Sequence, residues 1–362
     1  MNRSRAQNDV VGDWSVRDAP MSAVSRTSAC ASPQADLTAQ RRRPPAISCV
    51  IPCHNEEQNL GRLLPVLSDA LTDCSPAWEV IVVDDGSTDS TPLTLSRWAQ
   101  TPGFRVIQLS RNFGKEAALT AGLQACAGEV VVMMDADMQH PPALIATFIQ
   151  RWQEGHDVVY ASRMGRGDES WLKRHGAGLF YALINASARF KVRPDAGDFR
   201  LMDRKVVDAL LSLPERNRFM KGLYAWVGFD GVAVPYVPDS RAHGLTRFNP
   251  LRLIGLSLDG LTAFTTWPLR LVSALGFALA LLSFVYGGYL TASYFLYGHD
   301  VSGWTTIVVG MMLLSGIQLL SLGVVGEYIA RVFAEVKGRP LFVVKRDIGH
   351  GLDTPERRNA QQ

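Results

Sequence analysis

The sequence predicts an α/β domain built on a mainly parallel β-sheet, followed by two helices that cross a membrane. From residue 46 onward, short apolar runs alternate with segments of helical periodicity. Two further segments near the C-terminus are long, apolar and free of charged side chains. Strands that alternate with helices form a parallel sheet covered on both faces, whereas long uncharged segments are typical of membrane-spanning helices.

Composition narrows the classes of protein. The 362 residues are enough for one large domain and an additional segment. A net charge of +3 gives no indication of a nucleic-acid partner, and 47% hydrophobic residues favour association with a membrane. The five cysteines are odd in number and lack metal-site or redox spacing, so we expect reduced thiols in a domain that faces the cytoplasm.

Residues 1–45 are polar and contain no apolar core of the kind found in signal peptides. We therefore expect a disordered lead-in. It ends in Arg41, Arg42 and Arg43, followed by two prolines. The basic triplet is expected to be solvated, with contact to anionic lipid as the alternative.

Five apolar runs are predicted to be strands, namely residues 46–52, 79–83, 104–110, 129–134 and 157–162. In parallel sheets, ligands bind beyond the carboxyl ends of the strands. The chain contains neither G-x-G-x-x-G nor a P-loop pattern, so neither a dinucleotide-binding fold nor a P-loop is supported.

Mostly polar residues lie at or just after the end of every one of these runs. In strand order they are Pro52, His54, Asn55 and Glu56; Asp84 and Asp85; Arg111, Asn112 and Lys115; Asp135, Asp137 and Gln139; Ser162 and Arg163. Because the ends of parallel strands meet at one edge of the sheet, these residues predict a site for a charged ligand and a cation.

The stretch MMDADMQHPP, residues 133–142, predicts where the cation binds. Side chains alternate along an extended segment, so Asp135 and Asp137 are expected on one side, with Gln139 continuing it. Mg²⁺ and Mn²⁺ take such oxygen ligands. The alternative is that these strand-end aspartates only stabilise a turn or a helix start, and His140 is interpreted as a turn residue.

The two uncharged segments are residues 271–298 and 301–326, each longer than the roughly 20 residues that a membrane-spanning helix needs. Basic residues flank the pair on both sides, and the short connection lacks them. The positive-inside rule then places both outer ends in the cytoplasm.

These signals divide the chain into six parts. They are a disordered tail (1–45), the α/β domain (46–249), an amphipathic helix on the membrane surface (250–268), two spanning helices (269–298 and 301–327) and a cytoplasmic C-terminal segment (328–362). For residues 250–268 a buried core helix is the alternative.

Three motifs, PCHNEEQNL, VVDDGSTDST and MMDADMQHPP, resemble those of glycosyltransferase family 2, whose members are inverting, metal-dependent nucleotide-sugar transferases. The stretches RNFGKEAALTAG, AGDFRLMDR, RFMKGLYAWVGF and GEYIARVFAEVKGRPLF resemble the branch that glycosylates polyprenyl phosphate. That branch includes bactoprenol glucosyltransferases and, more distantly, dolichol-phosphate mannose synthase. The resemblance covers residues 46 to 345 and implies a GT-A-type domain at the inner, cytoplasmic membrane.

The resemblance also implies roles on the donor side. The residues that it places at the nucleotide sugar are Pro52, Asn55, Glu56, Asp84, Asp85, Lys115 and Asp135, and those at Mg²⁺ or Mn²⁺ are Asp135, Asp137 and Gln139. Asp85 is favoured over Asp84 for contact with the base or ribose. For Asp84 and Asp85 the alternative is a helix cap. For Glu56 it is a favourable charge at a helix start. For Lys115 it is an exposed surface lysine.

On the acceptor side, a lipid phosphate requires cations. The resemblance implies Arg163, Lys173, Arg174, Arg241 and Arg247, in segments that also carry Arg166, His243 and Thr246. The family pattern ends in Ser-Lys where this chain has Thr246 and Arg247, which puts donor or acceptor preference in doubt. Asp137, Asp198 and Arg200 are predicted catalytic residues. Asp198 is expected to act as a base or to orient the acceptor or Arg200, with a helix cap as the alternative.

The predicted reaction is transfer of a sugar, with inversion, onto a polyprenyl phosphate such as undecaprenyl phosphate. UDP-glucose is the expected donor, and GDP-mannose, UDP-N-acetylglucosamine and UDP-aminoarabinose are alternatives. A homo-oligomer is left open. A processive polysaccharide synthase is disfavoured because Q-x-x-R-W is missing, and a D-x-D phosphatase because of the separate Asp84–Asp85 pair. The complete set of polar strand ends argues against an inactive scaffold.

Overall fold

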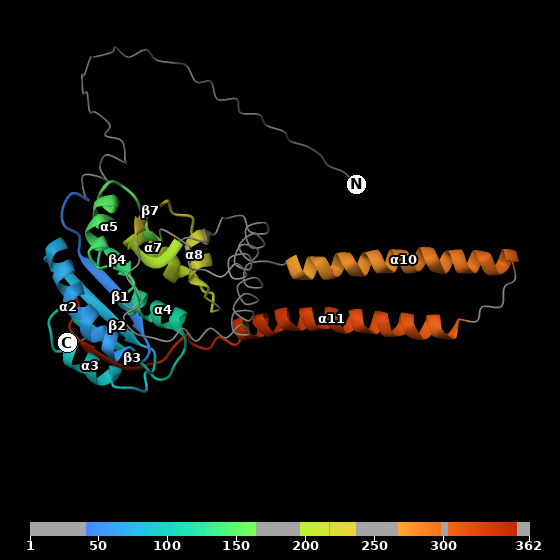
Figure 1. Cartoon of the computed structure of the whole chain (residues 1–362), viewed down its shortest axis with the longest axis horizontal. Helices are drawn as coiled ribbons and strands as arrows, with labels where there is room; N and C mark the ends of the chain where they lie inside the picture. The colour runs from blue at the N-terminus through green and yellow to red at the C-terminus, as the bar shows by residue number, and fades with distance from the viewer. Residues whose placement is uncertain (1–40, 164–195, 217, 237–266, 298–302, 353–362) are drawn as a thin grey trace, which may run out of the picture.

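The computed structural model describes residues 41–163, 196–216, 218–236, 267–297 and 303–352. They form an α/β domain and a long helical hairpin that extends from one side of it (Figure 1). The predicted fold class is confirmed in both parts.

The domain is organised around one eight-stranded sheet with the strand order β7-β5-β6-β4-β1-β2-β3-β8. The strands are β1 (Ile47–Cys53), β2 (Trp78–Asp84), β3 (Phe104–Leu109), β4 (Val130–Met133), β5 (Val158–Arg163), β6 (Ala196–Asp203), β7 (Gly231–Tyr236) and β8 (Val344–Gly349). The five predicted strands are β1 to β5. Since β4 and β5 each pair antiparallel with β6, all five run in the same direction.

Helices cover both faces of the sheet (Figure 1), which explains why the central strands are continuous apolar runs. One face is covered by α2 (Glu57–Cys74), α3 (Thr91–Trp98) and α5 (Leu144–Gln153), and the other by α4 (Lys115–Ala125), α7 (Arg204–Ser212) and α8 (Met220–Trp226). Helix α4 packs especially close to β1. A Cβ atom at Gly122 would overlap Val50, so glycine is required there.

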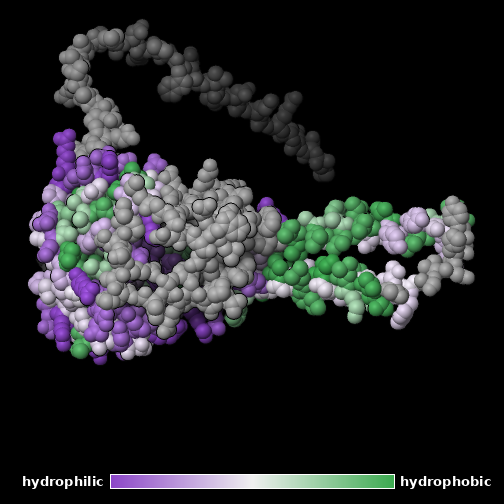
Figure 2. All heavy atoms as spheres, in the orientation of Figure 1, coloured by the Kyte–Doolittle hydropathy of each residue, from purple (hydrophilic) through white to green (hydrophobic). Residues whose placement is uncertain are grey.

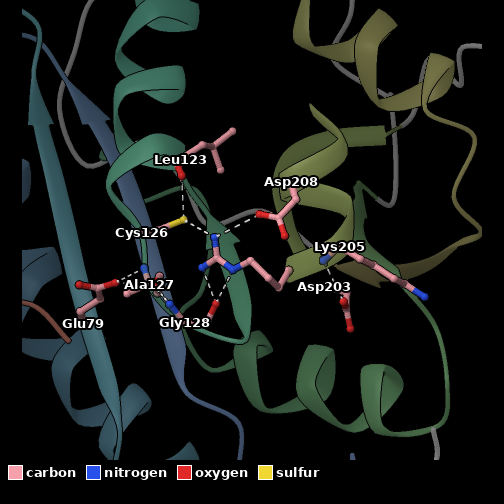
Figure 3. A network of polar contacts seen from close by, with 10 residues as sticks. Glu79, Leu123, Cys126, Ala127, Gly128, Asp203, Lys205 and Asp208 are labelled. Atoms are coloured by element: carbon pink, nitrogen blue, oxygen red, sulfur yellow. Dashed lines mark hydrogen bonds and ion pairs between the residues drawn. The ribbon is translucent and has the colours of Figure 1, made fainter. Parts of the chain in front are cut away.

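The amino edge of the sheet, where β1, β2 and β4 begin, is held by a polar network (Figure 3). The Arg204 guanidinium donates to the carbonyl of Gly128, with Nε at 2.9 Å, and lies near the Cys126 thiol. The Glu79 carboxylate, fully buried, accepts from the Ser48 hydroxyl at 2.6 Å. These bonds satisfy the buried polar groups at this edge of the sheet. The network therefore stabilises the fold.

The N-terminal boundary differs from the expectation of a tail that is solvated through residue 43. Arg41 is only 7% exposed and forms ion pairs with Asp157 at 2.9 Å and Asp203 at 2.7 Å. Its guanidinium also lies 4.8 Å from the centre of the Trp152 ring. The domain therefore begins by residue 41, because the buried Arg41 guanidinium pairs with two partly buried carboxylates of the domain.

The C-terminal boundary also differs. Residues 328–362 were expected outside the α/β domain, yet β8 pairs antiparallel with β3 and closes that side of the sheet. Arg105 on β3 forms an ion pair with Asp347 on β8. Beyond the strand, the backbone N–H of Leu352 donates to buried Glu79 at 2.9 Å. The chain thus returns to the domain after the hairpin.

The hairpin consists of α10 (Trp267–Tyr297) and α11 (Trp304–Val336). Residues 269–296 and 306–336 are long and apolar enough to cross a membrane, and their apolar windows are not buried by other described parts of the chain. Figure 2 shows a hydrophobic surface along both helices. Helix α11 continues past the predicted end of the span at residue 327. Most of the predicted surface helix, residues 250–266, lies outside the described residues.

Candidate active site

A cavity of about 330 Å³ lies at the carboxyl edge of the sheet, beyond the ends of β1, β2 and β4. Its walls come from the residues after these strands, the loop after β3 and the first turns of α4. Residues that follow four of the five predicted strands meet here, as expected from the sequence, whereas Ser162 and Arg163 at the end of β5 are not among the residues that line the cavity.

The end of β1 contributes Pro52 to the cavity wall, and the turn after it contributes Glu56. Asn55 has a left-handed backbone with φ of 59°, and its side-chain oxygen accepts from the backbone N–H of Thr88 at 2.8 Å. Glu56 accepts from the Asn59 amide at 2.6 Å. The Asn55 side chain therefore joins two loops, whereas Glu56 remains at the cavity.

The first aspartate after β2 is committed to the fold. Asp84 is completely buried, and one oxygen accepts from the backbone N–H of Ser87 at 2.9 Å. Its other oxygen accepts from the Gln108 side chain at 3.2 Å. Asp84 therefore stabilises the turn after β2 rather than capping a helix, since α3 begins only at Thr91, and contact between Asp84 and a nucleotide stays a prediction.

Asp85 lines the cavity and shapes its floor. Its two oxygens accept from the backbone N–H groups of Phe113 at 2.7 Å and Gly114 at 2.8 Å. The loop after β3 can approach so closely because Gly86, with φ of 66°, has no Cβ to overlap the Arg111 backbone. Asp85 thus fixes the start of α4 beside the cavity.

The D-x-D segment is a turn rather than the extended stretch that the sequence suggested. Strand β4 ends at Met133, and Met138 adopts φ of 63°. Asp137 accepts from the backbone N–H of Gln139 at 3.1 Å. Asp135 and Asp137 nevertheless line the same cavity, because the turn redirects the chain. Simple alternation gave the wrong local geometry for these residues.

Lys115, at the start of α4, connects the turn after β4 with strand β6 through its ammonium group. The Nζ atom lies 2.7 Å from one Asp135 oxygen and 2.7 Å from an oxygen of Asp198 on β6. Burial lowers the pKa of Lys115, but the two carboxylates outweigh it and raise that pKa above its ordinary value. Burial would raise the pKa of Asp198, but Lys115 holds it below its usual range. Asp198 is therefore an ionised carboxylate.

Behind Asp198 lie groups that the cavity does not expose. Arg200 is 3% exposed, donates to the Gly197 carbonyl at 2.6 Å and stacks 3.6 Å from the centre of the Tyr224 ring. Its predicted catalytic role would have to act through Asp198, since the guanidinium is not at the cavity wall.

Glu116 was missed by sequence reasoning. One of its carboxyl oxygens is buried without a hydrogen-bond partner. Burial, reinforced by nearby Asp198, raises the Glu116 pKa to about 7. A glutamate in the first turn of a helix is an ordinary favourable charge, so nothing in the sequence marked it.

His140, interpreted as a turn residue, also packs into the domain. Its ring stacks on Phe199 with the ring centres 5.0 Å apart. Burial lowers the pKa of His140.

The predicted acceptor-side cations are only partly described. Arg163 is the exposed last residue of β5. The others lie outside the described residues, and they are Lys173, Arg174, Arg241 and Arg247, together with Arg166, His243 and Thr246.

The residues at the cavity fit a divalent cation that is shared with a substrate. Asp135 and Asp137 offer carboxylate oxygens, the donors that Mg²⁺ and Mn²⁺ prefer. Within the described ranges, no group of three or more His, Cys, Asp or Glu side chains is placed to hold a metal ion alone. Such a site suits a cation held by one or two carboxylates plus the phosphates of a ligand.

Family comparison now defines the class of protein. The family model for glycosyl transferase family 2 matches residues 48–211, and the model for the GtrB C-terminal hairpin matches residues 267–332. The chain belongs to glycosyltransferase family 2 and is a glycosyltransferase. The hairpin match, together with the two apolar helices, marks it as membrane-associated.

Individual relatives are similar to this chain over most of their length. An uncharacterized glycosyltransferase of Synechocystis is 44% identical over 82% of this chain and 94% of its own length. The bactoprenol glucosyl transferase of Shigella phage SfII is 38% identical over 83% of this chain and 97% of its own. A prophage bactoprenol glucosyl transferase homolog of Escherichia coli K12 is also 38% identical, over 83% and 98%.

Solved structures give a more distant likeness. A Pyrobaculum calidifontis mannosyltransferase in complex with GDP-Man and Mn²⁺ is 18% identical, with a TM-score of 0.42 over 82% of this chain and 87% of that one. The glucosyl-3-phosphoglycerate synthase of Mycobacterium tuberculosis, in complex with Mn²⁺, UDP-glucose and phosphoglyceric acid, is 21% identical, with a TM-score of 0.42 over 63% and 80%. At these scores the fold assignment rests on the family model and on the sheet topology.

Proposed function

We propose that this glycosyltransferase transfers glucose from UDP-glucose to a polyprenyl phosphate, such as undecaprenyl phosphate, with inversion at the anomeric carbon. The observation that carries the proposal is one cavity at the carboxyl edge that joins Asp85, Asp135, Asp137 and Lys115. Relatives called bactoprenol glucosyl transferases align with it over nearly their whole length and supply the expected acceptor and sugar.

The donor would lie in this cavity. Pro52, Glu56 and Asp85 form the wall against which the nucleotide packs. Asp135 and Asp137 would hold Mg²⁺ or Mn²⁺, with Gln139 as a third oxygen ligand. A bound divalent cation neutralises the charge that develops on the departing diphosphate.

The acceptor would approach from the side of Asp198. A phosphate monoester has a second pKa of about 6, so its attacking oxygen is already largely ionised near neutral pH. Asp198, itself ionised, then orients the acceptor rather than removing a proton. The lipid-phosphate oxygen bonds to the anomeric carbon while the bond to the diphosphate breaks and the nucleoside diphosphate leaves. Positioning and electrostatic stabilisation supply most of the rate enhancement.

Membrane topology follows from the return of the chain to the sheet. The α/β domain precedes α10, and β8 follows α11 and pairs with β3. Both ends of the hairpin must then lie on the same side, as two membrane crossings require. We place the domain and both termini in the cytoplasm, where nucleotide sugars are made available, with Arg163 facing the lipid phosphate.

The test is a transfer assay with purified protein in detergent. Undecaprenyl phosphate, Mg²⁺ or Mn²⁺ and a panel of radiolabelled nucleotide sugars are incubated together, and label is counted in the organic phase. Label from UDP-glucose alone, lost with EDTA and with Asp137→Ala, is the expected result. Label from GDP-mannose, UDP-N-acetylglucosamine or UDP-aminoarabinose instead would correct the donor. Donor hydrolysis without lipid-borne label would refute the lipid acceptor.

A further inference from the structure

The ammonium group of Lys115 occupies an unusual position for a lysine in a proposed metal site. Both oxygens of Asp135 lie within hydrogen-bonding distance of Nζ, at 2.7 and 2.9 Å. A third oxygen, from Asp198, lies at 2.7 Å. The Lys115 ammonium group therefore contacts both oxygens of Asp135, the carboxylate that is expected to bind a divalent ion.

We propose that Lys115 is a positioning residue that holds Asp135 in the metal-free enzyme and competes with the divalent cation for that carboxylate. The inference rests on the proposed function, since it takes Asp135 as a metal ligand. It goes further by assigning Lys115 to control of metal loading, rather than only to contact with the nucleotide.

Electrostatics is the reason for the competition. A divalent ion bound to Asp135 would lie about 2.1 Å from a carboxylate oxygen, and so within a few ångströms of an ammonium that contacts the same group. Like charges so close repel strongly in a partly buried site. The ammonium must therefore leave Asp135, or the metal must bind more weakly.

The structure provides a place for the lysine to remain. Asp198 comes from a different strand and keeps its own contact with Nζ when Asp135 is given up. The Lys115 side chain is 41% exposed, which leaves room for it to turn. Metal loading would then leave Lys115 paired with Asp198 alone, on the acceptor side of the cavity.

Lys221 on α8 offers a matched control. Its charge also lowers the pKa values of Asp198 and Glu116, so it lies in the same electrostatic field. No contact between Lys221 and Asp135 is found among the described residues. Removing either lysine deletes one positive charge near the cavity, but only Lys115→Met frees the Asp135 carboxylate.

The experiment measures Mn²⁺ binding to the full-length protein in detergent, with and without UDP and against a protein-free blank, from the electron paramagnetic resonance signal of free Mn²⁺. Wild type, Lys115→Met, Lys115→Arg, Lys221→Met and Asp137→Ala are compared, and thermal unfolding checks that each is folded. Loss of a charge-assisted pair predicts about tenfold tighter binding for Lys115→Met. Lys221→Met should change binding less than about twofold, and Lys115→Arg should resemble wild type.

The outcomes separate the two proposals. Binding that Asp137→Ala abolishes, but that Lys115→Met leaves unchanged or weakens, overturns the competition and keeps the metal site. Equal tightening by both Met variants also overturns it, because a general field would then suffice. If wild type and Asp137→Ala bind Mn²⁺ equally, both with and without UDP and up to millimolar Mn²⁺, the metal site and the competition are overturned together.

Discussion

Two pairs of aspartates end two strands of the same sheet, yet their surroundings differ completely. At the end of β2, Asp84 and Asp85 accept hydrogen bonds from three backbone N–H groups and one side-chain amide. At the end of β4, Asp135 is held by the Lys115 ammonium, and Asp137 accepts from one backbone N–H in its own turn.

The difference lies in what occupies the carboxylate oxygens. Backbone N–H groups cannot leave, so a carboxylate that they satisfy is part of the fold. A flexible ammonium can be exchanged for another cation, so a carboxylate that it holds stays available for chemistry. The ends of β2 and β4, which lie on either side of β1 in the sheet, therefore differ in how firmly their carboxylates are bound to the fold.

Asp135→Asn should produce the largest effect on catalysis. It removes the charge that holds both Lys115 and the proposed metal ion, so transfer to lipid phosphate should fall about 10³-fold or more. The rate of label transfer measures this loss, and thermal unfolding checks the fold. A variant that keeps more than a tenth of the wild-type rate would contradict the assignment of β4 as the functional strand end.

Glu116→Gln extends the comparison to a third kind of carboxyl group, one with a buried oxygen that has no hydrogen-bond partner. The pKa of Glu116 in the folded state is about 7, above its ordinary value of 4.5. Its contribution to stability is therefore complete below pH 4.5 and is lost as the pH rises through 7, amounting to up to about 3 kcal/mol. The glutamine variant should lose less stability between pH 6 and pH 9.

Thermal unfolding midpoints at the two pH values test this prediction. Glu154→Gln is the control, because that residue forms a surface pair with Arg151 and should leave the pH dependence unchanged. Identical pH dependence in wild type and Glu116→Gln would show that the buried carboxyl group does not titrate in this range.

Asp85→Asn should damage the fold more than Asp84→Asn. Both Asp85 oxygens accept from backbone N–H groups, so an amide NH₂ in either orientation would face a donor. An unsatisfied buried donor costs about 1–3 kcal/mol. Chemical denaturation should show this loss, and a stability equal to that of wild type would mean that the loop after β3 does not depend on Asp85.

Asp84→Asn should have the smallest effect. The new amide can keep its oxygen toward the Ser87 N–H, and the Gln108 amide can turn to present its own oxygen. We expect a loss of under about 1 kcal/mol and a transfer rate within twofold of wild type. A loss of activity comparable to that of Asp135→Asn would erase the distinction between the two strand ends.

Much of the fold was predictable, because β1 to β4 are mainly apolar runs separated by helical periodicity. Strand β8, with the sequence VKRDIG, has no such run and is recognisable only through its pairing with β3. The role of Arg41 depends on Asp157 and Asp203, which are distant in the chain. A basic triplet beside prolines gives no sign of such partners.

The site was predictable as a set of strand ends, but not in its division of roles. Adjacent Asp84 and Asp85 differ only through partners that other loops bring to them. The turn at Met138 places a non-glycine residue at positive φ, which sequence pattern does not anticipate. The bridge from Lys115 to Asp198 joins α4 to β6, and no spacing in the chain encodes it.

The return of the chain to the sheet through β8 has a practical consequence for making a water-soluble version of the enzyme. A chain shortened after residue 266 would lose β8 and leave β3 with an open edge, a template for strand-to-strand aggregation. Replacing residues 267–337 with a short flexible linker, while keeping residues 338–352, would preserve the edge strand and the contact of Leu352 with Glu79. In this protein the helical hairpin is an insertion into the domain, so it has to be removed by an internal deletion rather than by truncating the chain.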